Sequence, residues 1–344
     1  MKVHIKYNFR DGPWGGANQF LKALRKQFKK KDVYTSDINE ADVILFNSHH
    51  EIEKVVNLKK VNQDKIFIHR VDGPVYKIRG NHMRTDNLIF RVNDSIADGT
   101  VYQTDWCKEN NIKLGMPTDN FETTINNSPD ADIFNRENKS DFHEDRPRII
   151  ATSWSDNWSK GFGVYKYLDE NLDFEEFDMT FIGNSPVEFE NINKIDPLPS
   201  EEIAEQLKKH DIFITASEND PCSNALIEAL SCGLPAAVLN DGGHPELIGQ
   251  GGEAFEGKED VIDAIKRIAN NYKKYQNNIP DFSIESKAEK YLSFMEEIYK
   301  KQQSGKYKPK RLSNYDIYMI KVRLIYNFIL SLPHRIRNYL NNKD

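Results

Sequence analysis

Short apolar runs that alternate with amphipathic segments are the feature that most constrains the fold of this chain. The strand-like run 2–8 is followed by 17–30, in which apolar residues recur at helical spacing. Continuous apolar runs such as 42–46 and 211–215 are typical of strands that are covered on both faces of a parallel sheet. Strands that alternate with helices in this way form βαβ units, so the pattern predicts an α/β fold.

The alternation occurs twice, once on each side of a charged segment. Residues 135–147 contain almost no apolar side chains, and a new strand-like run begins at 148. We therefore expect two doubly wound, Rossmann-like domains with parallel sheets, an N-terminal one over 1–140 and a C-terminal one over 141–300. Ligands of such sheets bind beyond the carboxyl ends of the strands, so the two domains should face each other across a central cleft.

Length and cysteine usage fit this organisation. The chain has 344 residues, about twice the usual domain length of roughly 100 to 200 residues. The sequence contains no run of about 18 apolar residues, which is the length needed to span a bilayer, and its N-terminus is already strand-like. We therefore expect a soluble, cytoplasmic protein. Cys107, Cys222 and Cys232 lack metal-ligand spacing and cannot all pair, which favours free thiols in a reducing compartment.

Charge is distributed unevenly along the chain. Residues 301–344 carry ten Lys or Arg against two Asp, a charge of +8, which leaves −14 on the first 300 residues because the total is −6. The acidic body argues against a general nucleic-acid binder. We expect residues 301–344 to form a basic, amphipathic helical tail, which either lies on an anionic membrane surface through 305–340 or packs its apolar stripe on the protein itself.

Two loops that follow strands could bind a phosphate. Gly15 and Gly16 lie between the first strand and the first helix, where the backbone can approach a ligand closely and a helix N-terminus favours an anion. The pair lacks the three-glycine spacing of a dinucleotide fingerprint, and a tight turn would also explain it. Lys160 stands at an expected helix start, where a cation is unfavourable unless an anion is bound; a solvated surface lysine is the alternative.

A turn of small residues opens an apolar helix in the second half of the chain. Ser223 or Asn224 can cap this helix, and the N–H groups around them, up to Ala225, can also bind a phosphate. Glu228 lies more than one turn into the helix, which is apolar almost all round, so its carboxylate needs a partner. Ribose hydroxyl groups would provide one, and a buried salt bridge is the alternative. Asp220 precedes the same turn.

Polar residues at the end of another expected strand are also candidates for the cleft. His69, Arg70 and Asp72 stand at the end of the run 65–72. In an open α/β sheet this end of a strand faces the ligand, so the cluster is expected near the cleft.

Together these motifs resemble the family 4 retaining glycosyltransferases, which have the GT-B fold. The family marker is a pair of acids eight positions apart, followed by a small-Cys-Gly-Leu-Pro step, and it matches Asp220, Glu228 and the sequence EALSCGLPAAV. Other landmarks occur in the family's order: the glycine pair, VYQTDWCKEN at 101, NNSPDADIF at 126, KGF at 160, TFIGN at 180 and DGGHPELI at 241. The resemblance spans about residues 1–300 and is more specific in the second half.

The resemblance implies a role for each candidate residue. Lys160 would bind the donor diphosphate, Asp220 and His69 would contact the transferred sugar, and these three are the expected catalytic residues. Glu228 would bind the ribose hydroxyls. The complete set of expected donor-binding residues is Gly15, Gly16, Arg70, Asp72, Gly183, Ser223, Asn224, Ala225 and Glu228.

The implied activity is transfer of a hexose-type sugar from a nucleotide-diphosphate sugar to an acceptor hydroxyl with retention of configuration. It needs no metal and no cofactor, since the sugar nucleotide is a co-substrate. The acceptor would be a glycan or a lipid-linked molecule in surface polysaccharide or glycolipid assembly, with peripheral attachment to the inner face of the membrane through the tail.

Two positions depart from the family pattern. Asp220 replaces the usual Glu, and Ser155 stands near the place of an Arg that usually precedes Lys160 by about five residues. One positive charge is therefore missing unless another residue such as Arg70 substitutes. The alternatives to a transferase are a nucleotide-sugar epimerase of the same architecture and an inactive GT-B protein that binds a carbohydrate or nucleotide.

Overall fold

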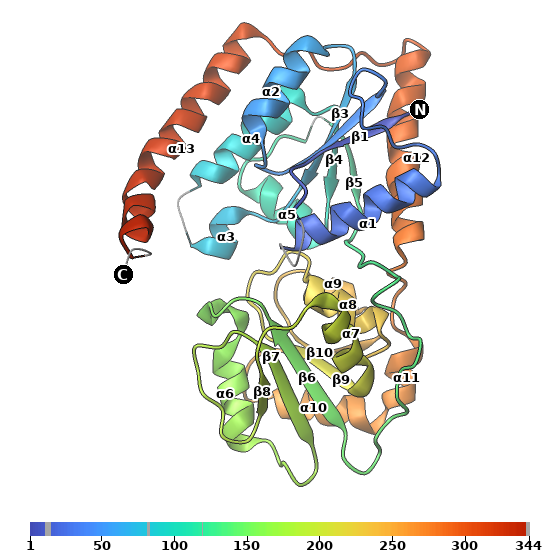
Figure 1. Cartoon of the computed structure of the whole chain (residues 1–344), viewed down its shortest axis with the longest axis vertical. Helices are drawn as coiled ribbons and strands as arrows, with labels where there is room; N and C mark the ends of the chain where they lie inside the picture. The colour runs from blue at the N-terminus through green and yellow to red at the C-terminus, as the bar shows by residue number, and fades with distance from the viewer. Residues whose placement is uncertain (11–14, 81–82, 119, 342–344) are drawn as a thin grey trace.

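The computed structural model describes residues 1–10, 15–80, 83–118 and 120–341, which form two lobes that are each built on a parallel sheet (Figure 1). The sheet of the N-terminal lobe has the order β1-β2-β3-β4-β5. Its strands are β1 (Val3–Lys6), β2 (Val43–Asn47), β3 (Ile66–Val71), β4 (Gly99–Tyr102) and β5 (Phe121–Thr124). A parallel bridge between Val3 and Tyr34 gives β1 a neighbour on its other side, so the strand order reverses at β1.

The sheet of the C-terminal lobe has the order β11-β10-β9-β6-β7-β8, and all of its pairs are parallel. Its strands are β6 (Arg148–Ser153), β7 (Asp178–Gly183), β8 (Asn193–Ile195), β9 (Ile212–Thr215), β10 (Ala236–Leu239) and β11 (Gly252–Phe255). This is the Rossmann order, in which the first strand lies at the centre and the strand order reverses beside it. The expected α/β class with two doubly wound parallel sheets is confirmed, while the short strands β8 and β11 were not anticipated from the sequence.

Helices cover both faces of the N-terminal sheet. They are α1 (Gly16–Lys30), α2 (Ile52–Val61), α3 (Val75–Arg79), α4 (Arg84–Ile96) and α5 (Asp105–Lys113). Phe20 and Leu24 of α1 pack in one core with Ile5 and Ile68 of the sheet, and Val55 and other apolar residues of α2 and α4 form a second core on the opposite face. The apolar spacing that predicted the first helix is therefore the spacing of its buried face.

The C-terminal lobe has the same layered arrangement. Its helices are α6 (Phe162–Asn171), α7 (Ser200–Lys209), α8 (Asn224–Ser231), α9 (His244–Ile248), α10 (Val261–Asn270) and α11 (Tyr272–Asn277), and a 3-10 turn η1 (Trp158–Lys160) precedes α6. Phe162 of α6 and Ile265 of α10 share one core, whereas Leu207 of α7 and Leu226 of α8 share the core on the other face. Cys107, Cys222 and Cys232 are free and buried, as the sequence indicated.

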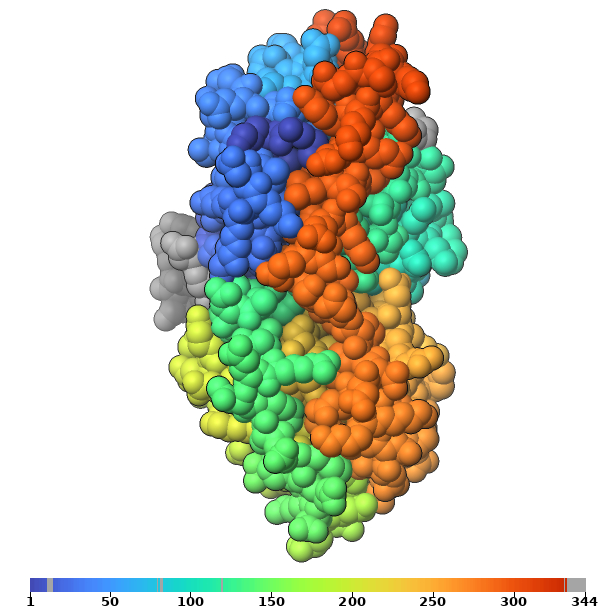
Figure 2. Space-filling view, turned by 90° about the vertical axis from the view of Figure 1, so that its right-hand side faces the viewer, coloured from blue at the N-terminus to red at the C-terminus, as the bar shows by residue number. Residues whose placement is uncertain are grey.

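The chain returns to the N-terminal lobe after it has formed the C-terminal one. Helix α12 (Ile284–Gln303) buries Tyr291 and Met295 in the core beneath β1 and β3, although most of its sequence lies within the range 141–300 expected for the C-terminal domain. Figure 2 shows the two segments that cross between the lobes, green near residue 130 and orange near 290, on one face of the molecule. The Ser128 hydroxyl donates a hydrogen bond to the Phe282 carbonyl where they meet.

Helix α13 (Asn314–Asn341) runs along the outer side of α4 (Figure 1). Ile320 is fully buried there, and Ile317 and Leu324 pack beside it against the core formed by α2 and α4. Part of the tail therefore packs on the protein itself, which was one of the two expectations for it. In the part of the chain that the structure describes, no helix is both long enough and apolar enough to cross a membrane.

Candidate functional site

Two adjoining cavities lie between the lobes, where the carboxyl ends of both sheets meet. The first chamber, of about 350 Å³, is lined from the N-terminal lobe by Gly16, Arg70, Asp72, Gln103 and Asn127, and from the C-terminal lobe by residues that include Lys160, Asp220, Ser223 and Asn224. The second chamber, of about 200 Å³, is lined by Gly15, Gly16, Gln19, Trp154, Ile182, Gly183, Leu198, Ile203, Ala225 and Glu228, among others. Both are lined by Gly16 and by Asn224 and Ala225 at the start of α8, so the two chambers adjoin.

The structure brings together all of the expected site residues except His69. Those that line the first chamber are Gly16, Arg70, Asp72, Lys160, Asp220, Ser223, Asn224 and Ala225. Gly15, Gly183 and Glu228 line the second chamber. The glycine loop after β1 and the turn before α8 therefore meet across the cleft, although more than 200 residues separate them in the sequence.

His69 is the exception, because it lines neither chamber. Its ring is fully buried and stacked on Phe46 with the ring centroids 4.3 Å apart. Its Nε2 lies 3.0 Å from the Ser48 carbonyl and its Nδ1 lies 3.1 Å from the Asn93 amide, so both nitrogens are occupied. Burial lowers the pKa of His69 to about 4, which keeps the ring neutral. The expectation that His69 contacts the sugar is not supported, because alternate residues of a strand face opposite sides of the sheet and Arg70 faces the cleft.

Lys160 and Asp220 form an ion pair across the first chamber. Lys160 ends the turn η1, which Asn157 caps by accepting a hydrogen bond from the Ser159 N–H. Its Nζ lies 3.2 Å from Asp220 Oδ2, and both side chains are partly exposed to the chamber. A carboxylate at this distance compensates a cation that otherwise stands at an unfavourable helix start. An entering anion can therefore compete with Asp220 for Lys160.

Helix α8 begins with its N–H groups at the boundary of the two chambers. Ser223 is the N-cap, and its hydroxyl oxygen accepts a hydrogen bond from the Leu226 N–H at 3.4 Å. Asn224 and Ala225, the first residues of the helix, line both cavities. The positive end of the helix dipole is thus available to an anion in the cleft.

Glu228 lies one turn further along α8 and lines the second chamber. Among the described residues it makes no ion pair, so the buried salt bridge that the sequence left open is not found there. Withdrawal of the side chain from bulk water raises the pKa of Glu228 to about 8. A half-buried carboxyl group without a charged partner costs folding free energy, and such groups are characteristic of ligand sites.

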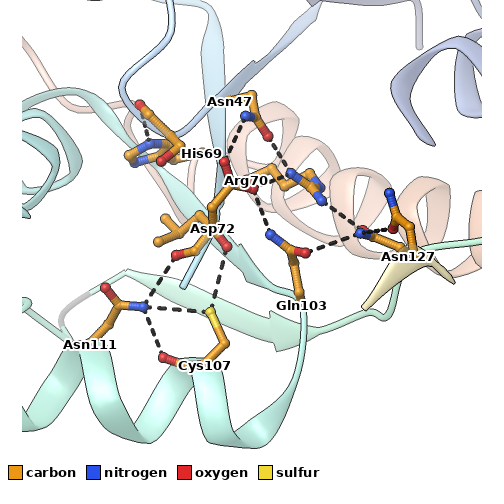
Figure 3. Close-up of polar contacts among 11 residues, drawn as sticks. Asn47, His69, Arg70, Asp72, Gln103, Cys107, Asn111 and Asn127 are labelled. Carbon is orange, nitrogen blue, oxygen red and sulfur yellow. Dashed lines mark hydrogen bonds and ion pairs between the residues drawn. The ribbon is translucent and has the colours of Figure 1, made fainter. Parts of the chain in front are cut away.

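A ring of hydrogen bonds surrounds Arg70 on the N-terminal side of the first chamber (Figure 3). Arg70 is 1% exposed, and its Nη1 lies 2.7 Å from Asp72 Oδ1. Its Nη2 donates to Asn127 Oδ1 at 2.6 Å, and the amide of Gln103 joins Asp72 to Asn127 with bonds of 2.6 and 3.1 Å. Burial is the largest single effect on Asp72 and opposes its ionisation, but Arg70, His50 and His49 together outweigh it and hold the pKa of Asp72 below its ordinary value. Arg70 is consequently a fixed structural cation, because Asp72, Asn47 and Asn127 bind its terminal nitrogens.

This ring extends across the cleft to the C-terminal lobe. Asn127 Nδ2 donates to Asn224 Oδ1 at 2.9 Å, which links the ring to the first residue of α8. Gly16 lies against the same side chain, since a methyl group added at Gly16 would come 2.0 Å from Asn224 Nδ2. A larger residue at this position would displace the Asn224 side chain from Asn127, so Gly16 contributes to the contact between the lobes as well as to the cavity.

Two further contacts hold the lobes together beside the cleft. Thr104 Oγ1 donates to the Pro221 carbonyl at 2.7 Å, and the Asp105 N–H donates to Glu246 at 2.7 Å. Desolvation raises the pKa of Glu246 above its ordinary value. The structure is thus a closed arrangement in which both lobes contribute to one site.

Gln103 and Asn127 were not identified from the sequence as site residues. Gln103 directly follows the buried strand β4, and this is the same signal that drew attention to Asp72 after β3. Asn127 lies in the segment NNSPDADIF, which the sequence indicated as a family landmark without assigning any of its residues to the site. The described ranges contain no group of three or more His, Cys, Asp or Glu residues that could hold a metal ion.

Comparisons with known proteins agree with this geometry. Residues 190–281, which include α8 and most of the acids discussed above, match the model of the family "Glycosyl transferases group 1". No curated protein sequence matches the chain. The expected similarity to this family is confirmed for the matched segment, which contains the marker formed by Asp220 and Glu228.

Solved glycosyltransferase structures share the fold of nearly the whole chain. Sucrose-phosphate synthase from Thermosynechococcus elongatus has 11% identity and a TM-score of 0.63 over 88% of this chain and 98% of that one. HepE from Anabaena in complex with UDP-glucose has 11% identity and a TM-score of 0.61 over 88% and 99%. Starch synthase IV from Arabidopsis thaliana bound to ADP and acarbose has 12% identity and a TM-score of 0.62 over 86% and 98%. The expected GT-B fold is confirmed.

Proposed function

We propose that this chain is a glycosyltransferase that moves a sugar from a nucleoside-diphosphate sugar to an acceptor hydroxyl group. The observation that carries the proposal is the arrangement of Lys160, the N-terminus of α8 and Glu228 around two adjoining chambers of one cleft. The first two favour an anion, and Glu228 has no ion-pair partner among the described residues. A molecule that carries both a diphosphate and a ribose satisfies all three groups at once.

The two chambers differ in ways that fit the two ends of such a donor. The second chamber contains apolar side chains such as Ile182, Leu198 and Ile203 together with Glu228, which suits a nucleoside whose ribose hydroxyls donate to the carboxylate. The first chamber is polar, which suits the diphosphate and the sugar. Similar structures hold UDP-glucose and ADP, and this supports a nucleotide sugar as the donor.

The chain's own groups can assist departure of the diphosphate. Negative charge develops on the leaving phosphate as the bond to the sugar breaks, and Lys160 and the N–H groups at the start of α8 are placed to stabilise it. Asp220 neutralises Lys160 in the absence of donor. Once the diphosphate binds Lys160, the Asp220 carboxylate becomes available to the sugar hydroxyls in the first chamber.

Arg70 does not act as a free replacement for the arginine that the family pattern places near Ser155. Arg70 lines the first chamber, but Asp72 compensates its charge and its terminal nitrogens are bound. We assign it a positioning role, since it orients Asn127, which in turn holds Asn224. Lys160 then carries most of the cationic contribution, and retention without a metal ion follows from the resemblance as part of the same proposal.

The proposed acceptor approaches the donor from the N-terminal lobe. A glycan or lipid-linked acceptor in surface polysaccharide or glycolipid assembly would enter from the N-terminal side of the first chamber, where Asp72 and Gln103 offer polar groups. Peripheral association with the inner face of a membrane through 305–340 belongs to this proposal, because a lipid-linked acceptor reaches the cleft from a bilayer surface.

A binding protein without turnover is the second candidate, and the absence of an arginine near Ser155 favours it. The two are distinguished by incubating the chain with a panel of nucleoside-diphosphate sugars and measuring release of the nucleoside diphosphate. The transferase proposal expects release with at least one donor, strongly reduced in Lys160→Ala and Glu228→Gln. The matched controls Lys209→Ala and Glu205→Gln change exposed residues of α7 and should release diphosphate as the native chain does. Donor binding without release would establish the binding protein instead.

A further inference from the structure

Helix α13 carries two apolar stripes, and among the residues that the structure describes only one of them packs into an apolar core. Ile317, Ile320 and Leu324 pack on the core of α2 and α4. Asp316 accepts hydrogen bonds from Arg91 and Ser95 of α4 and so fixes the start of the helix. This face is a firm attachment, and it presents the opposite face of α13 away from the lobe.

The opposite face forms a continuous apolar surface. Six side chains at intervals of three and four residues are between 37% and 65% exposed, and we call them the outer stripe: Tyr315, Tyr318, Val322, Ile325, Ile329 and Leu332. At 3.6 residues per turn the outer stripe lies about 140° from the docked stripe and extends for roughly 26 Å along the helix. Soluble chains rarely expose an apolar surface of this extent unless something binds to it.

The spacing of the outer stripe alone would also suit a second copy of α13, because alternating steps of three and four form a coiled-coil seam. The charge of α13 disfavours a second copy of the helix as the binding partner. The sequence from Ile317 to Asn341 contains no Asp or Glu, whereas Lys321, Arg323, Arg335 and Arg337 all lie within it. Two such helices in contact would bring like charges together with no acid to pair them.

An anionic lipid surface complements the same features. Lys321 is exposed on α13, and Lys306 and Lys308 are exposed in the segment before it. Tyrosines and aliphatic side chains on one face with lysine and arginine beside them are characteristic of helices that lie in the plane of a membrane interface. The first 300 residues carry a charge of −14 and would be repelled by such a surface, so the attraction is confined to this region.

We propose that the outer stripe of α13 attaches the chain to an anionic membrane, with the helix axis parallel to the bilayer surface. The N-terminal lobe then rests against the membrane. The C-terminal end of α13 lies at the level of α3, so the cleft-facing end of that lobe is held near the lipid (Figure 1). Attachment itself does not depend on the proposed transferase activity, but delivery of a lipid-linked acceptor to the cleft rests on it.

The test is co-sedimentation of the full chain with vesicles of phosphatidylcholine alone and of phosphatidylcholine mixed with phosphatidylglycerol. We expect binding to the mixed vesicles, weakened by added salt because the attraction is partly electrostatic. The double change Ile325→Ser and Ile329→Ser should weaken binding by at least about tenfold, since each isoleucine loses its burial in the interface. Lys321→Glu should weaken it by about fivefold or more, because one basic residue near such a surface contributes about that factor.

Matched controls change the same residue types elsewhere on the surface. Val61→Ser on α2 alters a 77% exposed aliphatic residue, and Lys290→Glu on α12 alters an exposed lysine; neither should affect vesicle binding. Circular dichroism and the melting temperature of every variant show whether it is folded. The thermal shift caused by UDP is measured on the same samples, so failure of membrane binding and failure of the proposed donor site are read separately.

Three results would overturn the proposal. The first is equal binding of the native chain and the isoleucine variant to mixed vesicles, and the second is no preference for mixed over neutral vesicles. The third is a dimer of the lipid-free chain in light scattering that the isoleucine variant converts to a monomer, which would identify a second copy as the occupant.

Discussion

Replacing Glu228 by glutamine should make the chain more stable and less active at the same time. The carboxyl group lies on α8 at the second chamber and makes no ion pair among the described residues. Its ionised form is therefore unfavourable in the folded chain in the absence of donor. Glutamine keeps nearly the same shape and a polar end, but it removes the charge, so the change isolates the electrostatic cost of the carboxylate.

The magnitude follows from the shift in the pKa of Glu228. The pKa rises from 4.5 to about 8 on folding, so the folded state holds a proton over a pH range in which the unfolded state has lost it. The free energy of unfolding of the native chain therefore falls as pH rises from about 4.5 to 8. The amount by which Glu228→Gln exceeds the native chain in free energy of unfolding grows over the same range. If the carboxyl group were fully shielded from water, the free energy of unfolding of Glu228→Gln would exceed that of the native chain by about 1 kcal/mol at pH 5 and 3 kcal/mol at pH 7. Glu228 is partly exposed to the chamber, and solvent screening reduces the expected gain at pH 7 to about 1–2 kcal/mol.

Differential scanning calorimetry at pH 5 and pH 7 measures the effect. The Glu228→Gln variant should melt several degrees above the native chain at pH 7, by about 2–4 °C per kcal/mol, and close to it at pH 5. The control Glu205→Gln, an exposed residue of α7, should melt with the native chain at both values. A Glu228→Gln variant that is less stable than the native chain at pH 7, or whose advantage does not grow with pH, would show that the carboxylate has a stabilising partner in the folded chain and would refute the reasoning.

Four further outcomes follow from the site. Lys160→Ala should lower kcat by about a hundredfold or more, because it removes the main cation facing the leaving diphosphate, as measured by nucleoside-diphosphate release. Asn127→Ala should lower kcat/KM by about tenfold, because it removes the hydrogen bond to Asn224 between the lobes and the bonds to Arg70 and Gln103 that orient it, while the Kd for UDP in calorimetric titration stays unchanged. Gly16→Ala should lower turnover because its methyl group would displace the Asn224 side chain at the start of α8, whereas Gly163→Ala, which meets no atom within 4 Å, should not. UDP affinity should rise by up to about tenfold per pH unit between pH 6 and 8, where binding requires Glu228 to lose its proton, and the dependence should be absent in Glu228→Gln; a flat profile in the native chain would contradict the role of the carboxylate.

The parts of the fold that the sequence predicted are those determined locally. Apolar runs such as 42–46 and 211–215 become central strands because a parallel sheet covered on both faces requires them. Ser223 caps α8 because the turn before it places a hydroxyl beside the first N–H groups. The meeting of Gly16 with that helix follows from the general position of ligand sites at the carboxyl ends of parallel strands.

The parts of the fold and site that could not be predicted depend on contacts between residues that are distant in the sequence. His69 and Arg70 are adjacent at the end of β3, and only the register of the sheet decides which of them faces the cleft. Helix α12 continues the C-terminal half in sequence, yet its apolar face complements the N-terminal core. Asn127 acquires its role only when the lobes are closed, because its partner Asn224 belongs to the other lobe.

Release of nucleoside diphosphate from a nucleotide sugar, measured together with the anomeric configuration of the product by NMR, tests the central claim most directly. With a donor that raises the melting temperature of the chain, the native protein should release nucleoside diphosphate and form a glycoside of the same anomeric configuration as the donor, and Lys160→Ala should do so at least about a hundredfold more slowly. Equal turnover by the native chain and Lys160→Ala, or no turnover of any donor that binds, would contradict the account of this cleft as a transferase site.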